Sequence, residues 1–360
     1  MKHGKIMKKI SALFLILSLI FNTLMLSGCK EKELQKFTDY SFDYFDTVTT
    51  IIGYAESREE FSKNCDEIKD KIAEYHRLFD IYNTYEGINN LASLNQTFDG
   101  EHKELQVDER IIDLLLFSKE MYRLTDGYVN IAAGSVLSIW HTYRTRGLID
   151  PQNASLPELA DLKKASKHTD IDDIIINEEK STVFLKDSAL SLDVGAIAKG
   201  YAVQKIGEFM KEKGFSSYIL NIGGNVKTLD KTPQGEDWKV GIENPNKEDT
   251  KNPYKEVLEI SNLSLVTSGN YQRFYTVDGK NYNHIINLDT LYPAENYASV
   301  SVLCEDSALA DCLSTALFCM DIDDGKKLIK SLKNVECLWI KADGEKIYSD
   351  NFKNYCNKEN

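Results

Sequence analysis

Basic residues are too few in this sequence for a protein that binds nucleic acid. Its 360 residues include 43 Lys and Arg against 56 Asp and Glu, for a formal net charge of −13. Nucleic-acid binding needs a basic surface that neutralises phosphates, and broad contact with anionic lipid needs one too. Long internal repeats and low-complexity tracts are also missing, which argues against a solenoid. The 42% of hydrophobic residues is typical of a globular chain with a large core.

The signatures of common nucleotide-binding and hydrolytic enzymes are missing as well. The sequence has no G-x-x-x-x-G-K-[ST] and no G-x-G-x-x-G, so neither a P-loop nor an ordinary Rossmann site is predicted. H-E-x-x-H and G-x-S-x-G are also absent. No two cysteines form a C-x-x-C pair, which excludes zinc-ribbon and thioredoxin sites. Six cysteines follow Cys29, and the sequence leaves their disulfide pairing open.

Only one hydrophobic run is long, and it lies at the N-terminus. Residues 1–9 carry lysines, residues 10–25 are nearly all apolar, and Leu26-Ser27-Gly28-Cys29 follows, with charge directly after it. This order is typical of a secretory signal, and its ending resembles a bacterial lipobox. The resemblance implies a lipoprotein signal peptide over residues 1–28 and lipid attachment to Cys29. We therefore expect a protein anchored by lipid to the extracytoplasmic face of the cell membrane; an uncleaved membrane helix is the alternative.

The rest of the chain predicts an α+β fold, because strand and helix patterns mix without a regular βαβ alternation. Its length suits one large domain or two intimately packed ones, after a polar tether over residues 29–40. The expected strands cover residues 44–54, 217–222, 237–243, 257–260, 263–267, 298–304 and 336–341, with a strand or hairpin over 182–192 and a hairpin over 271–286. The expected helices cover residues 57–79, 108–121, 197–213 and 307–320, and residues 141–180 are expected to form loops and short helices.

Two segments place oxygen-bearing side chains near expected helices. In residues 191–201, Asp193 ends a strand, a Gly-Ala turn follows, and Lys199 lies near the helix N-terminus, which favours an anionic group such as phosphate. An ordinary solvated cap gives the same pattern. In residues 310–316, Asp311 and Thr315 share one face of a helix. A carboxylate with a hydroxyl suits Mg²⁺, although an acid stabilised by the helix dipole is the alternative.

Two further segments are informative only in combination with these. Asn221-Ile222-Gly223-Gly224-Asn225 places two glycines after a strand, where the backbone can approach a ligand closely. His284 lies between an expected strand and a polar turn, and histidine can act there as a base or an acid. Each segment alone is also compatible with a purely structural function.

In this order, the four segments resemble the ApbE family of flavin transferases. The resemblance rests on S-L-D-V-G-A-I-A-K-G-Y, N-I-G-G-N, H-I-I-N-L-D-T and A-D-C-L-S-T-A-L-F, and runs from about Tyr44 to near the C-terminus. It implies a single large domain of two intimately packed subdomains over residues 41–355. It also implies an FAD:protein FMN transferase that needs Mg²⁺. Such an enzyme cleaves FAD, attaches FMN through a phosphoester to a Thr or Ser hydroxyl of an exported or membrane redox protein, and releases AMP.

The resemblance also assigns roles to individual residues. It implies that His284 is the base that deprotonates the acceptor hydroxyl, and that Asp311, Thr315 and the backbone carbonyl of Ala196 hold Mg²⁺. The FAD contacts that it implies are Tyr82, Tyr128, Val129, Asn130, Asp193, Lys199 and Ile285. The chain departs from the family pattern at Val129-Asn130, where Phe-Asp is usual, and at Phe45-Asp46-Thr47, where many members have Met-Gly-Thr.

Two other functions stay open on the sequence. An Mg²⁺-dependent FAD pyrophosphatase would use water as the acceptor and give free FMN and AMP. A lipid-anchored flavin-binding protein without turnover would bind FAD and release no AMP. The pair of Asp311 and Thr315 favours an enzyme, because a protein that only binds flavin has no need of a metal beside the diphosphate.

Overall fold

The computed structural model describes residues 33–96 and 104–358. The expected signal peptide over residues 1–28 and the lipidation site Cys29 lie outside these residues. Within the described part of the chain, no helix has the length and apolar character needed to cross a membrane. The six cysteines found there are all free thiols.

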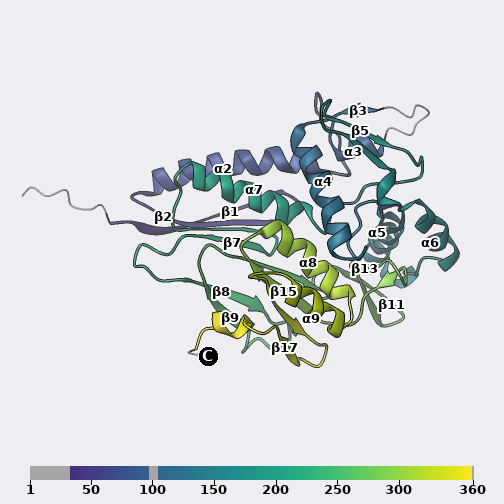
Figure 1. The fold of residues 1–360 in the computed structure, drawn as a ribbon. Helices are drawn as coiled ribbons and strands as arrows, with labels where there is room; N and C mark the ends of the chain where they lie inside the picture. The colour runs from purple at the N-terminus through teal and green to yellow at the C-terminus, as the bar shows by residue number, and fades with distance from the viewer. Residues whose placement is uncertain (1–32, 97–103, 359–360) are drawn as a thin grey trace, which may run out of the picture.

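An eight-stranded antiparallel sheet forms the centre of the molecule (Figure 1). Its strands follow the order β1-β2-β6-β7-β10-β15-β16-β17. They are β1 (Gln35–Tyr44), β2 (Thr47–Ala55), β6 (Tyr218–Ile222), β7 (Asn225–Leu229), β10 (Ser264–Gly269), β15 (Ser299–Cys304), β16 (Glu336–Ile340) and β17 (Lys346–Tyr348). Strands from the two ends of the described chain therefore form the two edges of one sheet.

Helices cover one face of this sheet, and a hairpin covers the other (Figure 1). The helices are α2 (Arg58–Phe79), α7 (Ala198–Glu212) and α8 (Ser307–Cys319), with α9 (Ile322–Ser331) after α8. Their apolar faces form the main core with side chains such as Ile51 and Val302 of the sheet. On the opposite face, β8 (Trp238–Glu243), β9 (Tyr254–Ile260) and the 3₁₀ helix η4 (Phe352–Tyr355) enclose a second core around Trp238 and Leu258.

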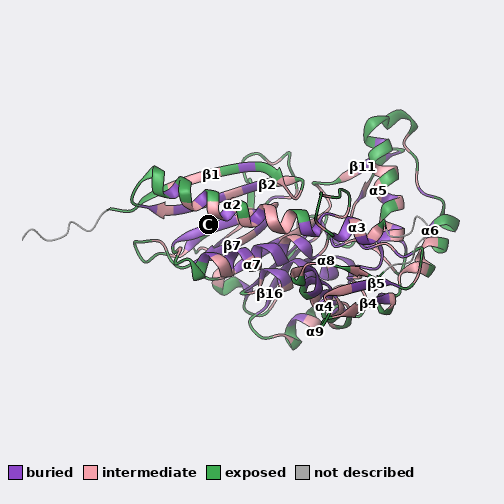
Figure 2. Cartoon of the chain, turned by 90° about the horizontal axis from the view of Figure 1, so that it is seen from above, coloured by how far each residue is buried: buried purple, intermediate pink, exposed green. Residues whose placement is uncertain are grey.

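A second group of elements packs at one end of the sheet. It contains α3 (Leu91–Asn95), α4 (Glu109–Leu124), α5 (Gly134–Ile149), α6 (Leu159–Ala165) and the small sheet of β3 (Leu105–Gln106), β5 (Thr182–Leu185) and β4 (Ile174–Asn177). The hairpins β11–β12 (Phe274–Val277, Lys280–Asn283) and β13–β14 (Ile286–Asn287, Tyr292–Pro293) adjoin it. Figure 2 shows buried residues continuing from the large sheet into this group, and side chains of α4 and β5 belong to the main core. This mixed arrangement confirms the α+β prediction.

The expected helices 57–79, 108–121, 197–213 and 307–320 are present within a few residues. Three expectations were wrong. The tether predicted over residues 29–40 is strand from Gln35 onward, because β1 pairs with β2 along its length. The loops and short helices expected over residues 141–180 begin only after residue 149, since the longer helix α5 continues to Ile149. The strand or hairpin expected over 182–192 also ends early, at Leu185.

Candidate active site

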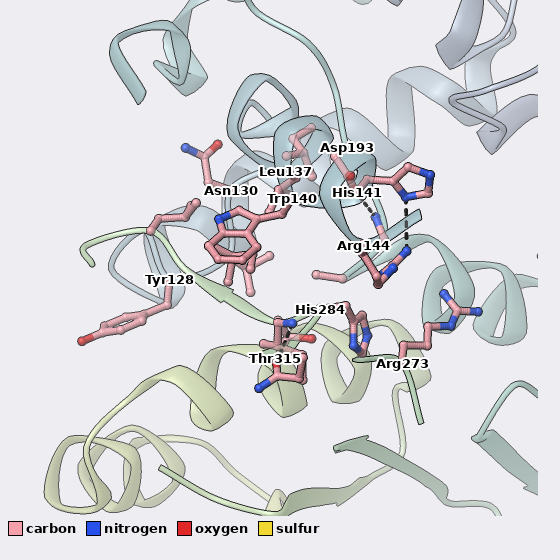
Figure 3. Close-up of a pocket in the computed structure, with 18 of the residues that line it drawn as sticks. Tyr128, Asn130, Leu137, Trp140, His141, Arg144, Asp193, Arg273, His284 and Thr315 are labelled. Carbon is pink, nitrogen blue, oxygen red and sulfur yellow. Dashed lines mark hydrogen bonds between the residues drawn. The ribbon is translucent and has the colours of Figure 1, made fainter. Parts of the chain in front are cut away.

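A cavity lies between α5, the turn that leads into α7, the hairpin β11–β12 and the middle of α8 (Figure 3). Ten residues that the sequence placed at the site line it: Tyr82, Tyr128, Val129, Asn130, Asp193, Ala196, Lys199, His284, Ile285 and Thr315. Asp311 lies one helical turn before Thr315, behind the cavity wall, and is only 4% exposed. The structure therefore brings segments that are far apart in the sequence to one place.

Asp311 is buried at the contact between α7 and α8. Its Oδ2 accepts a hydrogen bond from the N–H of Gly200 at 2.8 Å and lies 3.8 Å from Nζ of Lys199. Burial raises the pKa of the Asp311 carboxyl, and the charge of Lys199 opposes this rise. The helices can approach this closely only because residue 200 is glycine: a Cβ there would lie 2.3 Å from Cβ of Asp311.

Lys199 connects this carboxylate to the turn before α7. Its Nζ donates a hydrogen bond to the carbonyl of Gly195 at 3.2 Å, next to Ala196. One turn along α8, Oγ1 of Thr315 lies 3.4 Å from Oγ of Ser268. The ammonium group of Lys199 thus lies between the Asp311 carboxylate and the carbonyl of Gly195, at the edge of the cavity.

These oxygen groups fit a hard cation such as Mg²⁺. Among the described residues, no three His, Cys, Asp or Glu side chains come together as metal ligands. The site offers one carboxylate, from Asp311, with the Thr315 hydroxyl and the Ala196 carbonyl. Mg²⁺ is usually held by one or two carboxylates and completes its shell with water and substrate phosphates. The residues therefore fit an Mg²⁺ that shares a phosphate ligand, and do not form a closed cage.

His284 lies in the short connection between β12 and β13. The backbone N–H of His284 donates a hydrogen bond to the carbonyl of Arg273 at 3.1 Å. The backbone N–H of Ile285 donates to Oδ1 of Asn283 at 2.8 Å. Nδ1 of His284 is buried and has no hydrogen-bond partner within the described chain. Burial first, and then the charges of Arg273, Arg144 and Lys199, lower the pKa of His284 to about 3. The imidazole is therefore neutral at physiological pH.

The remaining expected contacts surround the cavity at different depths. Oδ1 of Asp193 accepts from the N–H of Gly195 at 2.9 Å, which closes the turn before α7, and burial raises the pKa of the Asp193 carboxyl. Asn130 has both ends of its amide occupied, since Nδ2 donates to the carbonyl of Thr169 at 2.8 Å and Oδ1 accepts from the N–H of Ala132 at 2.9 Å. Its amide therefore braces the cavity wall.

The aromatic and apolar contacts differ in exposure. Val129 is 2% exposed and belongs to the main core, so little of its side chain is free for a ligand. Tyr82 is 56% exposed, and its ring lies 5.3 Å from the ring of His141. Tyr82 is therefore the contact best placed to stack on an incoming planar ring.

The sequence prediction missed one wall of the cavity. Leu137, Trp140, His141 and Arg144 of α5 line it, as does Arg273 before β11. Nη2 of Arg144 lies 3.2 Å from Nδ1 of His141, and burial together with Arg273 lowers the pKa of Arg144. The sequence did contain a signal for this wall. Residues 127–149 contain no Asp or Glu in a chain that is acidic overall, which is typical of a segment that faces an anionic ligand.

Comparison with known families agrees with this arrangement. Residues 45–339 match the ApbE family. The chain belongs to the ApbE family. An FAD:protein FMN transferase of Klebsiella pneumoniae is 27% identical over 285 residues, which cover 76% of this chain and 84% of that protein. An FAD:protein FMN transferase of Treponema pallidum is 30% identical over 251 residues, which cover 66% of this chain and 67% of that protein. These relatives identify the chain as a transferase.

Solved structures show the same fold. The ApbE protein of Thermotoga maritima superposes with a TM-score of 0.77 at 23% identity, covering 90% of this chain and all of that one. The flavin transferase ApbE from Vibrio cholerae gives a TM-score of 0.73 at 21% identity, again over 90% of this chain and all of the other. The ApbE-like fold expected from the sequence is thereby confirmed.

Proposed function

We propose that this chain is an Mg²⁺-dependent FAD:protein FMN transferase that releases AMP. The observation that carries the proposal is one cavity lined by three cationic side chains and a buried neutral histidine, with the oxygen groups of Ala196 and Thr315 in its wall and that of Asp311 behind it. The names of the relatives support FAD as the substrate and a protein as the recipient of FMN.

The cationic side chains supply the charge that a diphosphate requires. Lys199, Arg144 and Arg273 line the cavity of a chain whose formal net charge is −13. Fixed donors of this kind stabilise the charge that moves between oxygens during phosphoryl transfer. Bound Mg²⁺, held by Asp311, Thr315 and the Ala196 carbonyl, would supply further neutralisation and polarise the phosphate oxygens.

His284 is proposed to accept the proton of the acceptor hydroxyl. The hydroxyl oxygen forms a bond to the phosphorus of the FMN half, the bond from that phosphorus to the bridging oxygen breaks, and AMP leaves with the bridging oxygen. The proton lost by the hydroxyl passes to the imidazole. Since this imidazole is neutral before the reaction, it has a free lone pair for that proton.

We propose that the acceptor is a Thr or Ser hydroxyl of an exported or membrane redox protein. The support is the lipobox-like segment Leu26-Ser27-Gly28-Cys29, which would anchor the enzyme at the extracytoplasmic face of the membrane through acyl chains on Cys29. An acceptor on the same side would meet the enzyme at the membrane surface.

The test combines two readouts on one reaction. The enzyme is incubated with FAD, MgCl₂ and a candidate acceptor; AMP is measured by chromatography, and attached flavin by fluorescence in a denaturing gel. We expect a fluorescent acceptor and one AMP per flavin attached, both abolished in Asp311→Asn with an unchanged melting temperature. AMP with free FMN and no labelled protein would indicate a pyrophosphatase instead, and bound FAD without AMP would indicate a flavin-binding protein.

A further inference from the structure

The turn between β1 and β2 has an unfavourable backbone conformation. Phe45 and Asp46 are its central residues, with φ angles of 53° and 49°, and Tyr44 and Thr47 pair across its ends. A two-residue turn of this kind needs positive φ at both central positions, which Asn and Gly usually occupy. A bulky residue such as Phe rarely adopts it, so contacts from outside the turn must hold it.

His76, near the C-terminal end of α2, provides these contacts. Its Nδ1 accepts a hydrogen bond from the N–H of Phe45 at 3.2 Å. The rings of Phe45 and His76 meet edge to face with centroids 5.5 Å apart, and the ring of Tyr44 meets His76 in the same way at 6.2 Å. The imidazole is thus bonded to the backbone of the turn and packed against both aromatic rings.

The partners of His76 also determine which of its nitrogens carries the proton. Because Nδ1 accepts from Phe45, the proton lies on Nε2, which faces Oη of Tyr85 at 3.4 Å. Tyr85 donates its own proton to Oδ2 of Asp80 at 2.8 Å, so its oxygen can accept from His76. Oδ1 of Asp80 accepts from the N–H of Tyr82 at 2.7 Å. A chain of hydrogen bonds therefore connects the turn to Tyr82, which lines the cavity.

The turn in its observed conformation also holds an arginine of the cavity. The carbonyl of Asp46 accepts a hydrogen bond from Nη2 of Arg273 at 3.3 Å. Arg273 lines the cavity, and its own carbonyl accepts from the N–H of His284. The direction of the Asp46 carbonyl depends on the left-handed conformation of the turn, so this conformation provides the guanidinium with a hydrogen-bond acceptor.

We infer that His76 is a positioning residue for the transfer reaction. It fixes the Phe45–Asp46 turn, and the turn holds Arg273 where the diphosphate of FAD binds. His76 does not itself line the cavity, so it acts through the turn. The inference rests on the proposed function, in which FAD binds in the cavity with its diphosphate beside Arg273.

The experiment measures the Kd of FAD for purified variants, from the change in flavin fluorescence on binding. We expect His76→Ala to raise the Kd about tenfold, and His76→Asn, whose amide oxygen can accept from the N–H of Phe45, to restore most of the affinity. Lys63→Ala, exposed on the same helix, is the matched control and leaves the Kd unchanged. Melting temperatures identify any variant that fails to fold.

A double-mutant cycle tests whether His76 acts through Arg273. Arg273→Ala alone raises the Kd, and adding His76→Ala to it should have little further effect, because the group being positioned is gone. Full additivity, an unchanged Kd in His76→Ala, or no recovery in His76→Asn would each overturn the inference. Wild-type protein that binds FAD but releases no AMP would refute the proposed function and leave this measurement valid.

Discussion

His284 is a neutral base in a cavity lined with positive charge. Burial and the charges of Arg273, Arg144 and Lys199 lower its pKa to about 3, so the free enzyme holds a base that takes up a proton only weakly. A bound diphosphate would offset the charge of these three cations. We therefore expect FAD to raise the pKa of His284 and so to make it a stronger base.

This coupling predicts two different titrations of one residue. The NMR signal of the His284 ring is assigned as the one that is missing from the spectrum of His284→Gln. In the free enzyme, this signal should show no protonation of His284 down to about pH 4. With FAD bound, the pKa of His284 should be higher by at least about one pH unit. Transfer should then slow as the pH falls through this raised pKa, because a protonated imidazole cannot accept the hydroxyl proton. A normal titration in the free enzyme, or one that FAD leaves unchanged, would contradict the assignment.

Arg144 of α5 places a guanidinium group in the wall of the cavity. Arg144→Gln should raise the KM for FAD by about tenfold to a hundredfold, because a charge-assisted hydrogen bond to phosphate contributes about 1.5–3 kcal/mol. Steady-state kinetics of AMP release measures this. Arg146→Gln, which changes an exposed arginine on the same helix, is the control. Equal effects of the two substitutions would show that Arg144 acts only through the overall charge of the chain.

At the scale of elements, the contact between α7 and α8 places the expected metal ligand. Gly200 allows this contact, since a Cβ at this position would lie 2.3 Å from both Cβ of Asp311 and the carbonyl oxygen of Ser307. The helix α8 begins at a well-formed cap, where Oδ1 of Asp306 accepts from the N–H groups of Ala308 and Leu309. The position of Asp311 thus depends on a local cap and on one close approach between helices.

Gly200→Ala should separate the two helices. We expect the free energy of unfolding to fall by about 1–3 kcal/mol, the usual cost of overpacking a core, even though alanine has the higher helix propensity. Urea denaturation measures the loss, with Lys211→Ala on the exposed side of α7 as the control. The variant should also lose Mg²⁺-dependent AMP release. Undiminished stability and activity would show that the contact tolerates a methyl group.

The elements with local signals could be predicted from the sequence. The helices that begin after Ser57 and Asp108 have apolar residues at helical spacing, and in both the side chain before the helix accepts a hydrogen bond from a backbone N–H of the first turn. The site segments around Asp193 and Asp311 were recognisable because each is a short continuous motif. Their meeting in one cavity depends on the order of strands in the sheet, which local patterns could not predict; the resemblance implied only that these segments share one site.

The elements that were missed have patterns set by distant parts of the chain. In β1, Ser41 is buried while Tyr40 and Phe42 are 62% and 74% exposed, so the alternation that indicates a strand is reversed in polarity. In α5, one side packs Val136 and Trp140 into a core completed by Tyr275 and Leu291. Another side faces the cavity, where polar and charged residues are needed for a ligand. A helix that lines a site therefore lacks the single apolar face that predicts helices.

In the whole molecule, positive side chains gather around one cavity although the net charge of the chain is negative. The chain carries a net charge of −13, yet Lys199, Arg144 and Arg273 face a single cavity. An acidic surface repels nucleic acids and other polyanions, while a local group of cations binds a small anion that can enter. This contrast agrees with a dinucleotide substrate held by its phosphates.

The N-terminal segment predicts where the whole molecule is found. Expressed in a bacterium that processes lipoproteins, the wild-type chain should sediment with membranes and incorporate a labelled fatty acid, whereas Cys29→Ser should incorporate none. The physical reason is that the thiol of Cys29 is the proposed site of acylation. Purified Cys29→Ser protein should keep its rate of AMP release, which serves as the control for folding. Labelling that survives the substitution would contradict the lipidation site.

A crystal structure of the enzyme with FAD and Mn²⁺, which can replace Mg²⁺ and is located by its anomalous scattering, would test the proposed metal site and base together. We predict one metal peak bound by the Asp311 carboxylate and the Thr315 hydroxyl, with the FAD diphosphate as a further ligand and His284 beside the phosphorus of the FMN half. FAD bound outside this cavity, or a metal that touches neither side chain of α8, would refute the proposed transferase site.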